Sequence, residues 1–465
     1  MTSTVDNAKA IRALLMLLVI FILGTLCLQG FNLVFEQVGE DVGAPTQASL
    51  ITAFPSIVLG IVCFIYGSLG DFVSLKRLVV VGLITLFVGS IVGFAATFFM
   101  EPNLWVVIVT RILQTAGEQV AGSVYLVIAT KYLKPELKVI FFGLFTAGYQ
   151  LSASIGVFAA GMLSSIHWQY LFLIPAVTII FLPFLVSALP DREVKSQKVD
   201  WLGISLFGIA IAFLTLFFTY MHWWLLGVSI LLFIVFALFI SNAKDPFITP
   251  AFFKNSRWIM GISLIIIFYF TNYCMSPIFN AVGGSVYGLS TSEVSTHIVW
   301  AFVVAAVFGT SSGAIVDKIG RKAAIITASC LMIIGFLGAA FTINSGFGIM
   351  TVFGCVFYAG CGTMYSPVVS TVLDTLTQEE SGRGVGMNDL FMNVTASIGI
   401  ALFGTWMAKG TFAGSSLVGV SGAAANYANL LTIGAAVVLV GLIVFLVCNR
   451  KIYSQGPAQT AEVQA

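Results

Sequence analysis

The chain has 465 residues and a formal net charge of +2, with 59% hydrophobic and only 9% charged residues. Soluble domains carry about 25% charged residues, so this composition excludes a soluble enzyme or binding module and indicates that lipid is the main solvent. We expect a lipid bilayer and no nucleic acid as its partner. The seven cysteines form no C-x-x-C pair and the three histidines are scattered, so we expect no metal, disulfide or cofactor.

Fourteen apolar stretches follow one another along the chain, each near the ~20 residues that a helix needs to cross a bilayer. The first resembles a signal peptide, but its apolar run is too long and it has no clear small-residue cleavage site. The stretches are 12–35, 46–69, 78–99, 104–130, 139–162, 167–189, 201–220, 223–241, 258–279, 294–316, 322–343, 346–372, 385–408 and 426–448. They predict an all-α polytopic membrane protein with 14 transmembrane helices.

The basic residues are distributed unevenly between the loops. With fourteen spans both termini share one side, and nearly every Lys and Arg falls on that side; Lys409 lies on the other, and Arg111 lies inside a span. Because cytoplasmic loops collect Lys and Arg, both termini are predicted to be cytoplasmic in a multi-pass protein of the cell (inner) membrane.

Two loops match each other: "GSLGDFVSLKR" (67–77) follows the second span, and "GAIVDKIGRK" (313–322) follows the tenth. In both, a Gly precedes an Asp by four residues and a Lys follows the Asp by five. We therefore expect an N-terminal six-helix bundle (1–190), two inserted helices with linkers (191–257), a C-terminal six-helix bundle (258–448) and a flexible tail (449–465). Transporters built from such repeats bind substrate between the halves, near the bilayer midplane.

The matching loops supply a candidate gate motif. In such a loop the Gly allows close helix approach, the acid suits the N-terminus of a neighbouring helix, and the basic residues bind lipid phosphates or the acid. A tight turn that merely collects positive charge is the alternative. The candidate gate residues are Gly67, Asp71, Lys76 and Arg77 in the first copy, and Gly313, Asp317, Arg321 and Lys322 in the second.

These loops resemble the loop signature of the major facilitator superfamily, with Ser74 in place of its usual Gly. "RILQTAGEQVAG" (111–122) resembles the fourth-helix signature of that family, with Thr115 in place of its first Gly. The fourteen spans and the segments 166–185, 244–257 and 289–294 are similar to the fourteen-helix tetracycline efflux proteins of the drug:proton antiporter branch. This resemblance implies a major facilitator fold with six, two inserted and six helices, and proton-driven drug export.

Two segments differ from that branch. "SIGVFAAG" (154–161) has Val157 and Ala160 where the antiporter signature has Pro and Gly, which leaves exchange and symport both open. The first span has Gln29 near the position of the family's acid, and the thirteenth lacks the expected acid. The coupling acids of the relatives therefore cannot be transferred, and they must be sought among this chain's own carboxyls.

Charged side chains inside a bilayer are costly and mark functional cavities. Arg111 and Glu118 are seven residues apart, which places them on one helix face about 10 Å apart, with Gln114 and Thr115 between them. Arg111 cannot release its proton and suits an anionic group, whereas Glu118 can carry a proton. Glu118 is the first predicted proton-coupling residue; a structural Arg–Glu pair is the alternative.

The thirteenth span offers Asp389, with Asn393 four residues later on the same face. Asp389 is the second predicted proton-coupling residue, with an acid at the membrane interface as the alternative; Asp374 is predicted to be a solvated loop charge. Polar side chains also serve to join helices, so the cavity assignments have that alternative. The predicted cavity-lining residues are Arg111, Gln114, Gln29, Asn32, Gln150, Asn272, Tyr273, Asn388 and Asn393.

The sequence has no Walker motif and no cluster typical of an intramembrane enzyme, so a proton-driven carrier, not an enzyme, is predicted. The leading hypothesis is a monomeric antiporter that takes protons and a small-molecule substrate, and that exports tetracycline-like or other amphipathic drugs from a bacterial cell. One alternative is a carrier of the same fold for a native metabolite or lipid-like compound. The other is a non-transporting membrane sensor.

Overall fold

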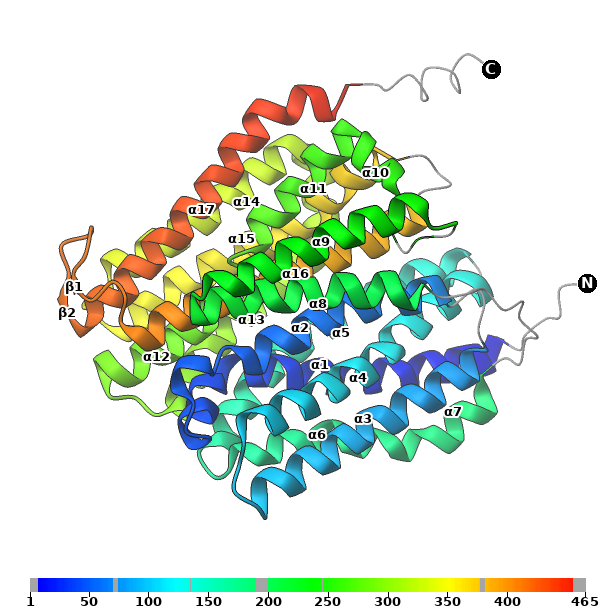
Figure 1. Ribbon diagram of the computed structural model, residues 1–465, viewed down its shortest axis with the longest axis horizontal. Helices are drawn as coiled ribbons and strands as arrows, with labels where there is room; N and C mark the ends of the chain where they lie inside the picture. The colour runs from blue at the N-terminus through cyan, green and yellow to red at the C-terminus, as the bar shows by residue number, and fades with distance from the viewer. Residues whose placement is uncertain are drawn as a thin grey trace, which may run out of the picture.

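The computed structural model describes residues 7–454 except 70–73, 134, 190–199, 245, 247 and 377–380. Long helices lie alongside one another in two groups, an N-terminal one drawn in blue and cyan and a C-terminal one drawn in yellow to red (Figure 1). A helix pairs its backbone groups internally, so it is the natural form of these apolar runs in lipid. We call the end at which α1 begins and α17 ends the termini side.

The first group contains α1 (Asn7–Asp41), η1 (Pro45–Gln47), α2 (Leu50–Leu69), α3 (Leu75–Phe98), α4 (Leu104–Tyr132), α5 (Pro135–Ser164), η2 (Trp168–Phe172), α6 (Leu173–Ala176), η3 (Val177–Phe181) and α7 (Leu182–Ala188). Two further helices follow, α8 (Trp201–Tyr220) and α9 (Trp223–Asn242). The second group contains α10 (Pro250–Lys254), α11 (Ser256–Tyr269), α12 (Met275–Tyr287), α13 (Thr291–Ile319), α14 (Arg321–Phe341), α15 (Phe347–Leu373), α16 (Ser381–Lys409), a hairpin of β1 (Gly414–Ser415) and β2 (Ser421–Gly422), and α17 (Ala423–Ile452).

Eleven helical segments within the described residues are long and apolar enough to cross a membrane. The segment α4 is not among them, because its polar stripe lowers its hydropathy. Leu151–Ser164 of α5 and the whole of α11 qualify only as shorter apolar helices. A polytopic all-helical protein is thus confirmed, and the count of fourteen spans stays a prediction.

Two of the predicted spans differ from the helices that the structure has. The span predicted at 258–279 is two helices, because α11 ends at Tyr269 and α12 begins at Met275. The carbonyl oxygen of Phe270 faces Gly399 of α16, where a side chain would collide with it. The span predicted at 167–189 alternates between 3-10 and α geometry, and Pro175 and Pro183 in this stretch lack the amide that a regular α-helix needs.

Two pairs of packed helices join the two groups. α2 packs along α16 and α5 packs along α13, while α8 packs against α9, α2 and α16. Small residues allow this approach: a side chain on Gly60 would touch Leu390, and one on Gly404 would touch Ser49. The contact between the two groups is therefore made by α2, α5, α13 and α16.

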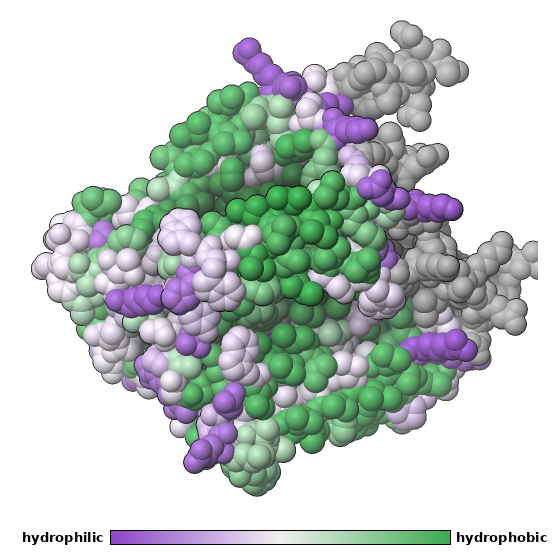
Figure 2. Space-filling view, in the orientation of Figure 1, coloured by the Kyte–Doolittle hydropathy of each residue, from purple (hydrophilic) through white to green (hydrophobic). Residues whose placement is uncertain are grey.

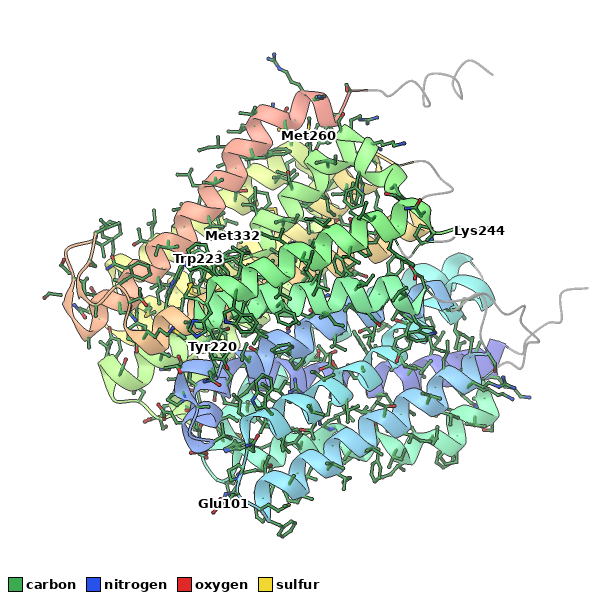
Figure 3. The ribbon with its side chains drawn as sticks, viewed as in Figure 1. Glu101, Tyr220, Trp223, Lys244, Met260 and Met332 are labelled. Carbon is green, nitrogen blue, oxygen red and sulfur yellow. The ribbon has the colours of Figure 1, made fainter. Side chains whose placement is uncertain are left out.

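The surface also fits a membrane. An apolar belt, green in Figure 2, separates more polar ends of the molecule. In Figure 3 Lys244 lies at the termini side, whereas Glu101, Tyr220 and Trp223 lie toward the opposite end. The connection between α8 and α9 is therefore on the side away from Lys244.

Candidate functional site

Arg111 is fully buried inside the first group of helices. Its Nη1 donates to Gln114 Oε1 at 2.8 Å and to Cys27 Sγ at 3.4 Å, and its guanidinium lies 4.3 Å from the ring centre of Phe31. Gln114 in turn donates to Ser90 Oγ at 2.8 Å. Arg111 thus joins α4 to α1, while Gln114 carries the network on to α3.

Glu118 lies at the middle of α4, fourteen residues from either end, which is about 21 Å of helix. Only 2% of its surface is exposed, and its Oε2 has no hydrogen-bond partner among the described residues. A Cβ placed on Gly24 of α1 would lie 2.6 Å from Glu118 Cβ and 3.0 Å from Oε2. The carboxyl is therefore tightly enclosed, and within the described residues Arg111 donates its hydrogen bonds to Gln114 and Cys27.

The two predicted cavity residues of α1 bond to each other. Asn32 Nδ2 donates to Gln29 Oε1 at 3.3 Å, and both side chains are buried. At the next residue of α1, Asn280 of α12 donates to the Leu33 carbonyl oxygen at 3.2 Å. Gln29 and Asn32 therefore precede the point at which α1 meets the second group of helices.

Asp389 lies in the second group, eight residues from the start of α16, or about 12 Å of helix. Its side chain is partly exposed. Asn393 Nδ2 donates to the Asp389 carbonyl oxygen at 2.8 Å, and Tyr273 donates to Asn393 Oδ1 at 3.4 Å. The neighbouring Asn388 is buried, and neither of its polar atoms has a partner within the described part of the chain.

Four tyrosines gather near Asp389, and we call them the tyrosine cluster: Tyr149 of α5, Tyr269 of α11, Tyr273 of the break and Tyr365 of α15. Asp389 acts electrostatically on three of them, and the side chains of Tyr149 and Tyr273 hydrogen-bond to each other. Tyr149 is 36% and Tyr365 is 47% exposed, although each lies within electrostatic reach of the other helix group. Both tyrosines therefore keep exposed surface while they lie near groups of the other helix bundle.

Glu118 and Asp389 act electrostatically on the same two side chains. Both carboxyls act on Cys63 of α2 and on Tyr149. Cys63 is partly exposed, whereas Cys27 beside Arg111 is buried. The predicted proton-coupling residues therefore approach the same space from opposite helix groups, with Cys63 and Tyr149 between them.

The remaining predicted residues lie elsewhere or outside the described part. Asp71 is outside it, and only the backbone is described at Gly67 and Gln150. Lys76 and Arg77 lie in the first turn of α3. In the second copy Gly313, Asp317 and Lys322 are exposed, and nothing lies within 4 Å of a side chain placed on Gly313. The close helix approach expected of this Gly is therefore not made. Asn272 is in the break after α11.

Arg321 of the second gate motif pairs with Asp374 at the end of α15. Asp374 was expected to be a solvated loop charge; its side chain is 54% exposed, and the pair ties the start of α14 to the end of α15.

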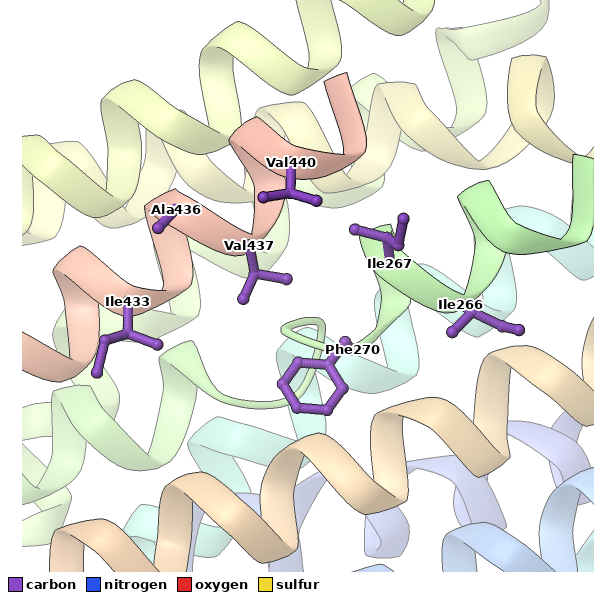
Figure 4. Close-up of a pocket in the computed structure, with 7 residues that line it drawn as sticks. All are labelled: Ile266, Ile267, Phe270, Ile433, Ala436, Val437 and Val440. Carbon is purple, nitrogen blue, oxygen red and sulfur yellow. The ribbon is translucent and has the colours of Figure 1, made fainter. Parts of the chain in front are cut away.

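An apolar groove lies outside this region, between α11 and α17 (Figure 4). Its lining side chains are Ile266, Ile267, Phe270, Ile433, Ala436, Val437 and Val440. The lining has no charged or polar side chain, so this groove offers neither a proton site nor a hydrogen bond to a substrate. The candidate site residues Tyr273, Asp389 and Asn393 are not among its lining residues.

Sequence reasoning missed Cys63, Tyr149, Tyr269 and Tyr365. Tyr149 precedes the predicted Gln150, but adjacent residues point to different sides of a helix. Tyr269 lies four residues before Tyr273, but the helix ends between them, so a shared helix face could not have revealed it. Nothing in the sequence places Cys63 or Tyr365 beside them.

Comparison with known proteins identifies the fold family. Residues 14–243 and 261–462 match the Major Facilitator Superfamily. The chain belongs to this family. It is therefore a multi-pass membrane transporter that handles small molecules, rather than an enzyme.

The relatives described next share a quarter or less of the aligned residues with this chain. The chain is 25% identical over 388 residues to the multidrug transporter protein MdtP of Bacillus subtilis (strain 168), covering 79% of this chain and 70% of that protein. It is 22% identical over 371 residues to the riboflavin transporter RibZ of Clostridioides difficile (strain 630), covering 77% of this chain and 79% of that protein.

Solved structures agree on the fold. A crystal structure of a POT family transporter in complex with a thioalcohol conjugated peptide matches with a TM-score of 0.68 and 12% identity, over 95% of this chain and 97% of that one. A D-xylose-proton symporter matches with a TM-score of 0.64 and 15% identity, over 93% of this chain and 97% of that one. At such low identity these matches support the major facilitator fold alone.

Proposed function

We propose that the protein is a proton-coupled antiporter that exports amphipathic drugs, tetracycline-like or of several kinds, from a bacterial cell. The observation that carries the proposal is the mid-membrane carboxyl of Glu118, enclosed by Gly24 and within electrostatic reach of the space between the helix groups. A carboxyl in such a place is costly, and a transporter can use it to bind and release a proton. The relatives named as multidrug transporters support a drug as the cargo.

The finer architecture belongs to the same proposal. Fourteen spans arise if α4, α5 and the pair α11–α12 each cross the membrane once, with η2 to α7 as one span and α8 and α9 as the inserted helices. Basic residues such as Lys9 and Lys244 lie on the termini side, which supports cytoplasmic termini in the cell membrane. Glu118 and Asp389 are the proposed coupling residues, and the gate motifs act at the termini side.

The free energy of proton entry is large enough to drive drug export. One proton that moves through a membrane potential of 100 mV supplies about 2.3 kcal/mol. A tenfold drug gradient requires about 1.4 kcal/mol. Exchange of one proton for one neutral drug molecule can therefore maintain more than a tenfold gradient.

The test uses everted membrane vesicles in which respiration acidifies the interior. Addition of tetracycline, ethidium or another drug that the protein carries should release protons and reduce the pH gradient. Glu118→Gln should abolish this response while it leaves the amount of folded protein unchanged, and Glu101→Gln, an exposed acid at the opposite end, should behave as wild type. A full response in Glu118→Gln would remove Glu118 from the mechanism.

A second candidate function is the carriage of a native metabolite, and the relative named as a riboflavin transporter favours it. The vesicle experiment separates the two. A lack of response to every drug, combined with a proton response or uptake on addition of riboflavin, would favour the metabolite carrier over the drug exporter.

A further inference from the structure

We infer that the apolar groove between α11 and α17 holds the end of one acyl chain of an anionic phospholipid, which belongs to the leaflet on the termini side and has its phosphate at Lys451. The inference concerns the lipid around the protein and not the cargo. It therefore goes beyond the proposed transport function and does not depend on it.

The groove lies at the middle depth of the membrane part. It has a volume of about 440 Å³ and is lined on α17 by residues between Ile433 and Val440 (Figure 4). Ile433 and Val440 lie ten and twelve residues from the two ends of α17, which is about 15 and 18 Å of helix. Half of a hydrocarbon core of about 30 Å is about 15 Å. The groove is therefore at the depth at which the acyl chains of a leaflet end.

The groove is open to lipid. Ile266 is 38% and Val440 is 52% exposed, so the lining is continuous with the apolar surface of the protein. A bilayer holds no water at this depth, and an apolar lining offers water no hydrogen bond. An apolar group must therefore fill the groove, and the apolar groups that surround a membrane protein are lipid chains.

The two ends of the groove face of α17 differ in polarity. Residues three, four or seven apart share a helix face, so this face continues to Asn429 in one direction and through Val447 to Lys451 in the other. Asn429 Nδ2 donates to the carbonyl oxygens of Phe412 and Ser415 at 3.0 Å each, which closes the first direction with polar groups. Val447 is 74% exposed, so the second direction stays apolar and open. A chain in the groove therefore comes from the termini side.

The end of α17 places positive charge where the phosphate of such a lipid lies. Lys451 is eleven residues beyond Val440, which is about 16 Å of helix and close to the depth of one leaflet. Lys451 and its neighbour Arg450 are both exposed. A lipid whose chain ends in the groove thus has its phosphate beside Lys451.

An acid near the end of α17 is already paired. Asp374 acts electrostatically on Tyr453, the residue after α17, but it pairs with Arg321. Arg257 of α11 adds a further cation, because its Nε donates to the Ile452 carbonyl oxygen at 3.0 Å. Together with Arg450 and Lys451 these described residues carry a net positive charge, which favours an anionic headgroup over a zwitterionic one.

A bound chain would also support the break after α11. The ring of Phe270 lines the groove, and it packs on Phe403 of α16 with the ring centres 6.3 Å apart. An empty groove leaves one side of this ring without contacts, and each missing contact loses dispersion energy. Phosphatidylglycerol should therefore raise the thermal midpoint of the purified protein.

The test uses the full-length protein in phosphatidylcholine nanodiscs that contain a small fraction of a photoreactive lipid. The lipid has a diazirine at the end of one chain and either a phosphatidylglycerol or a phosphatidylcholine headgroup. Mass spectrometry of the peptides should find the phosphatidylglycerol probe at 266–270 and 433–440, about fivefold more than the phosphatidylcholine probe. The lipid-facing segment of α3 around Val88, which is 44% exposed, should take up both probes equally.

Two variants separate the chain from the headgroup. Ala436→Trp fills the groove, so it should reduce labelling of 266–270 by both probes, and the lipid-facing control Val88→Trp should not. Lys451→Gln should lower labelling by the phosphatidylglycerol probe alone, by about fivefold. Lys244→Gln removes an exposed lysine on the same side and should leave the labelling unchanged.

Full labelling of 266–270 in folded Ala436→Trp, or no more label in the groove than around Val88, would overturn the chain site. Equal labelling by the two probes, or no effect of the surface substitution Lys451→Gln, would overturn the anionic headgroup. Loss of the label on addition of ethidium but not of phosphatidylglycerol would make the groove a drug site and overturn the inference. Because no proton movement is measured, these failures would leave the proposed antiport untouched, and failure of the vesicle experiment would leave the lipid site standing.

Discussion

Glu118 and Asp389 are both carboxyls within the membrane part of the protein, yet the helices around them differ. Glu118 lies on a continuous helix, at its middle, and Gly24 of α1 closes over it. Asp389 lies on α16 near a broken helix, and it is flanked by an Asn and by tyrosines with exposed surface. The closed setting suits a proton, and the open setting suits a larger ligand.

The difference arises from glycines on opposite sides of the molecule. Gly24 makes room for a side chain, so α1 and α4 stay regular and the acid is enclosed. Gly399 makes room for a backbone carbonyl, that of Phe270, at the point where α11 has ended. The broken helix therefore places Tyr273 in a turn, from which it reaches Asn393. Substitutions at these positions test the comparison directly.

The largest effect is expected from Gly399→Val. Its side chain would occupy the position of the Phe270 carbonyl oxygen, and backbone cannot move aside as a flexible side chain can. Overpacking typically costs about 1–3 kcal/mol and more where backbone is displaced, so the thermal midpoint in detergent should fall strongly, with loss of monodisperse protein. Gly24→Ala should cost less, because its nearest neighbour, Glu118 Cβ, lies at 2.6 Å, whereas a side chain on Gly399 would lie much closer to the Phe270 carbonyl oxygen.

Gly313→Ala is the matched control for both substitutions, because nothing lies within 4 Å of a side chain placed there. Since Ala is the better helix former by roughly 0.5–1 kcal/mol, this variant should be as stable as wild type or slightly more stable. A Gly399→Val protein with an unchanged thermal midpoint would contradict the role of Gly399 in accommodating the break.

Sequence reasoning found the elements whose signal is local. The apolar runs predicted most of the long helices, and the seven-residue spacing placed Arg111 and Glu118 on one buried stripe of α4. The break at 270–274 could not be predicted, because Gly399, more than a hundred residues away, accommodates it. For the same reason Cys63 and Tyr365 were missed: only the packing of α2 and α15 beside α16 brings them to Asp389.

A medium effect is expected in the reactivity of two cysteines. Cys63 lies between the two acids and is partly exposed, while Cys27 is buried with its thiol donating to the Leu171 carbonyl oxygen at 3.3 Å. In variants that retain one cysteine each, a water-soluble maleimide should label Cys63 about tenfold faster or more, because Cys63 has exposed surface and Cys27 has none. Mass spectrometry of timed samples measures both rates. Equal rates for the two cysteines would contradict the difference in access between the surroundings of Cys63 and those of Cys27.

The smallest effect is expected from a carboxyl outside the enclosed region. Asp374 pairs with Arg321 at the termini side, with side chains 54% and 36% exposed. Exposed ion pairs contribute about 0–1 kcal/mol, because water and salt screen them. Asp374→Asn should therefore lower the thermal midpoint by only a degree or two, and less at high salt, with the proton response of the vesicles unchanged. If its loss proved as damaging to that response as Glu118→Gln, the effect of a carboxyl would not depend on whether it is enclosed, and the contrast between enclosed and exposed acids would lose its basis.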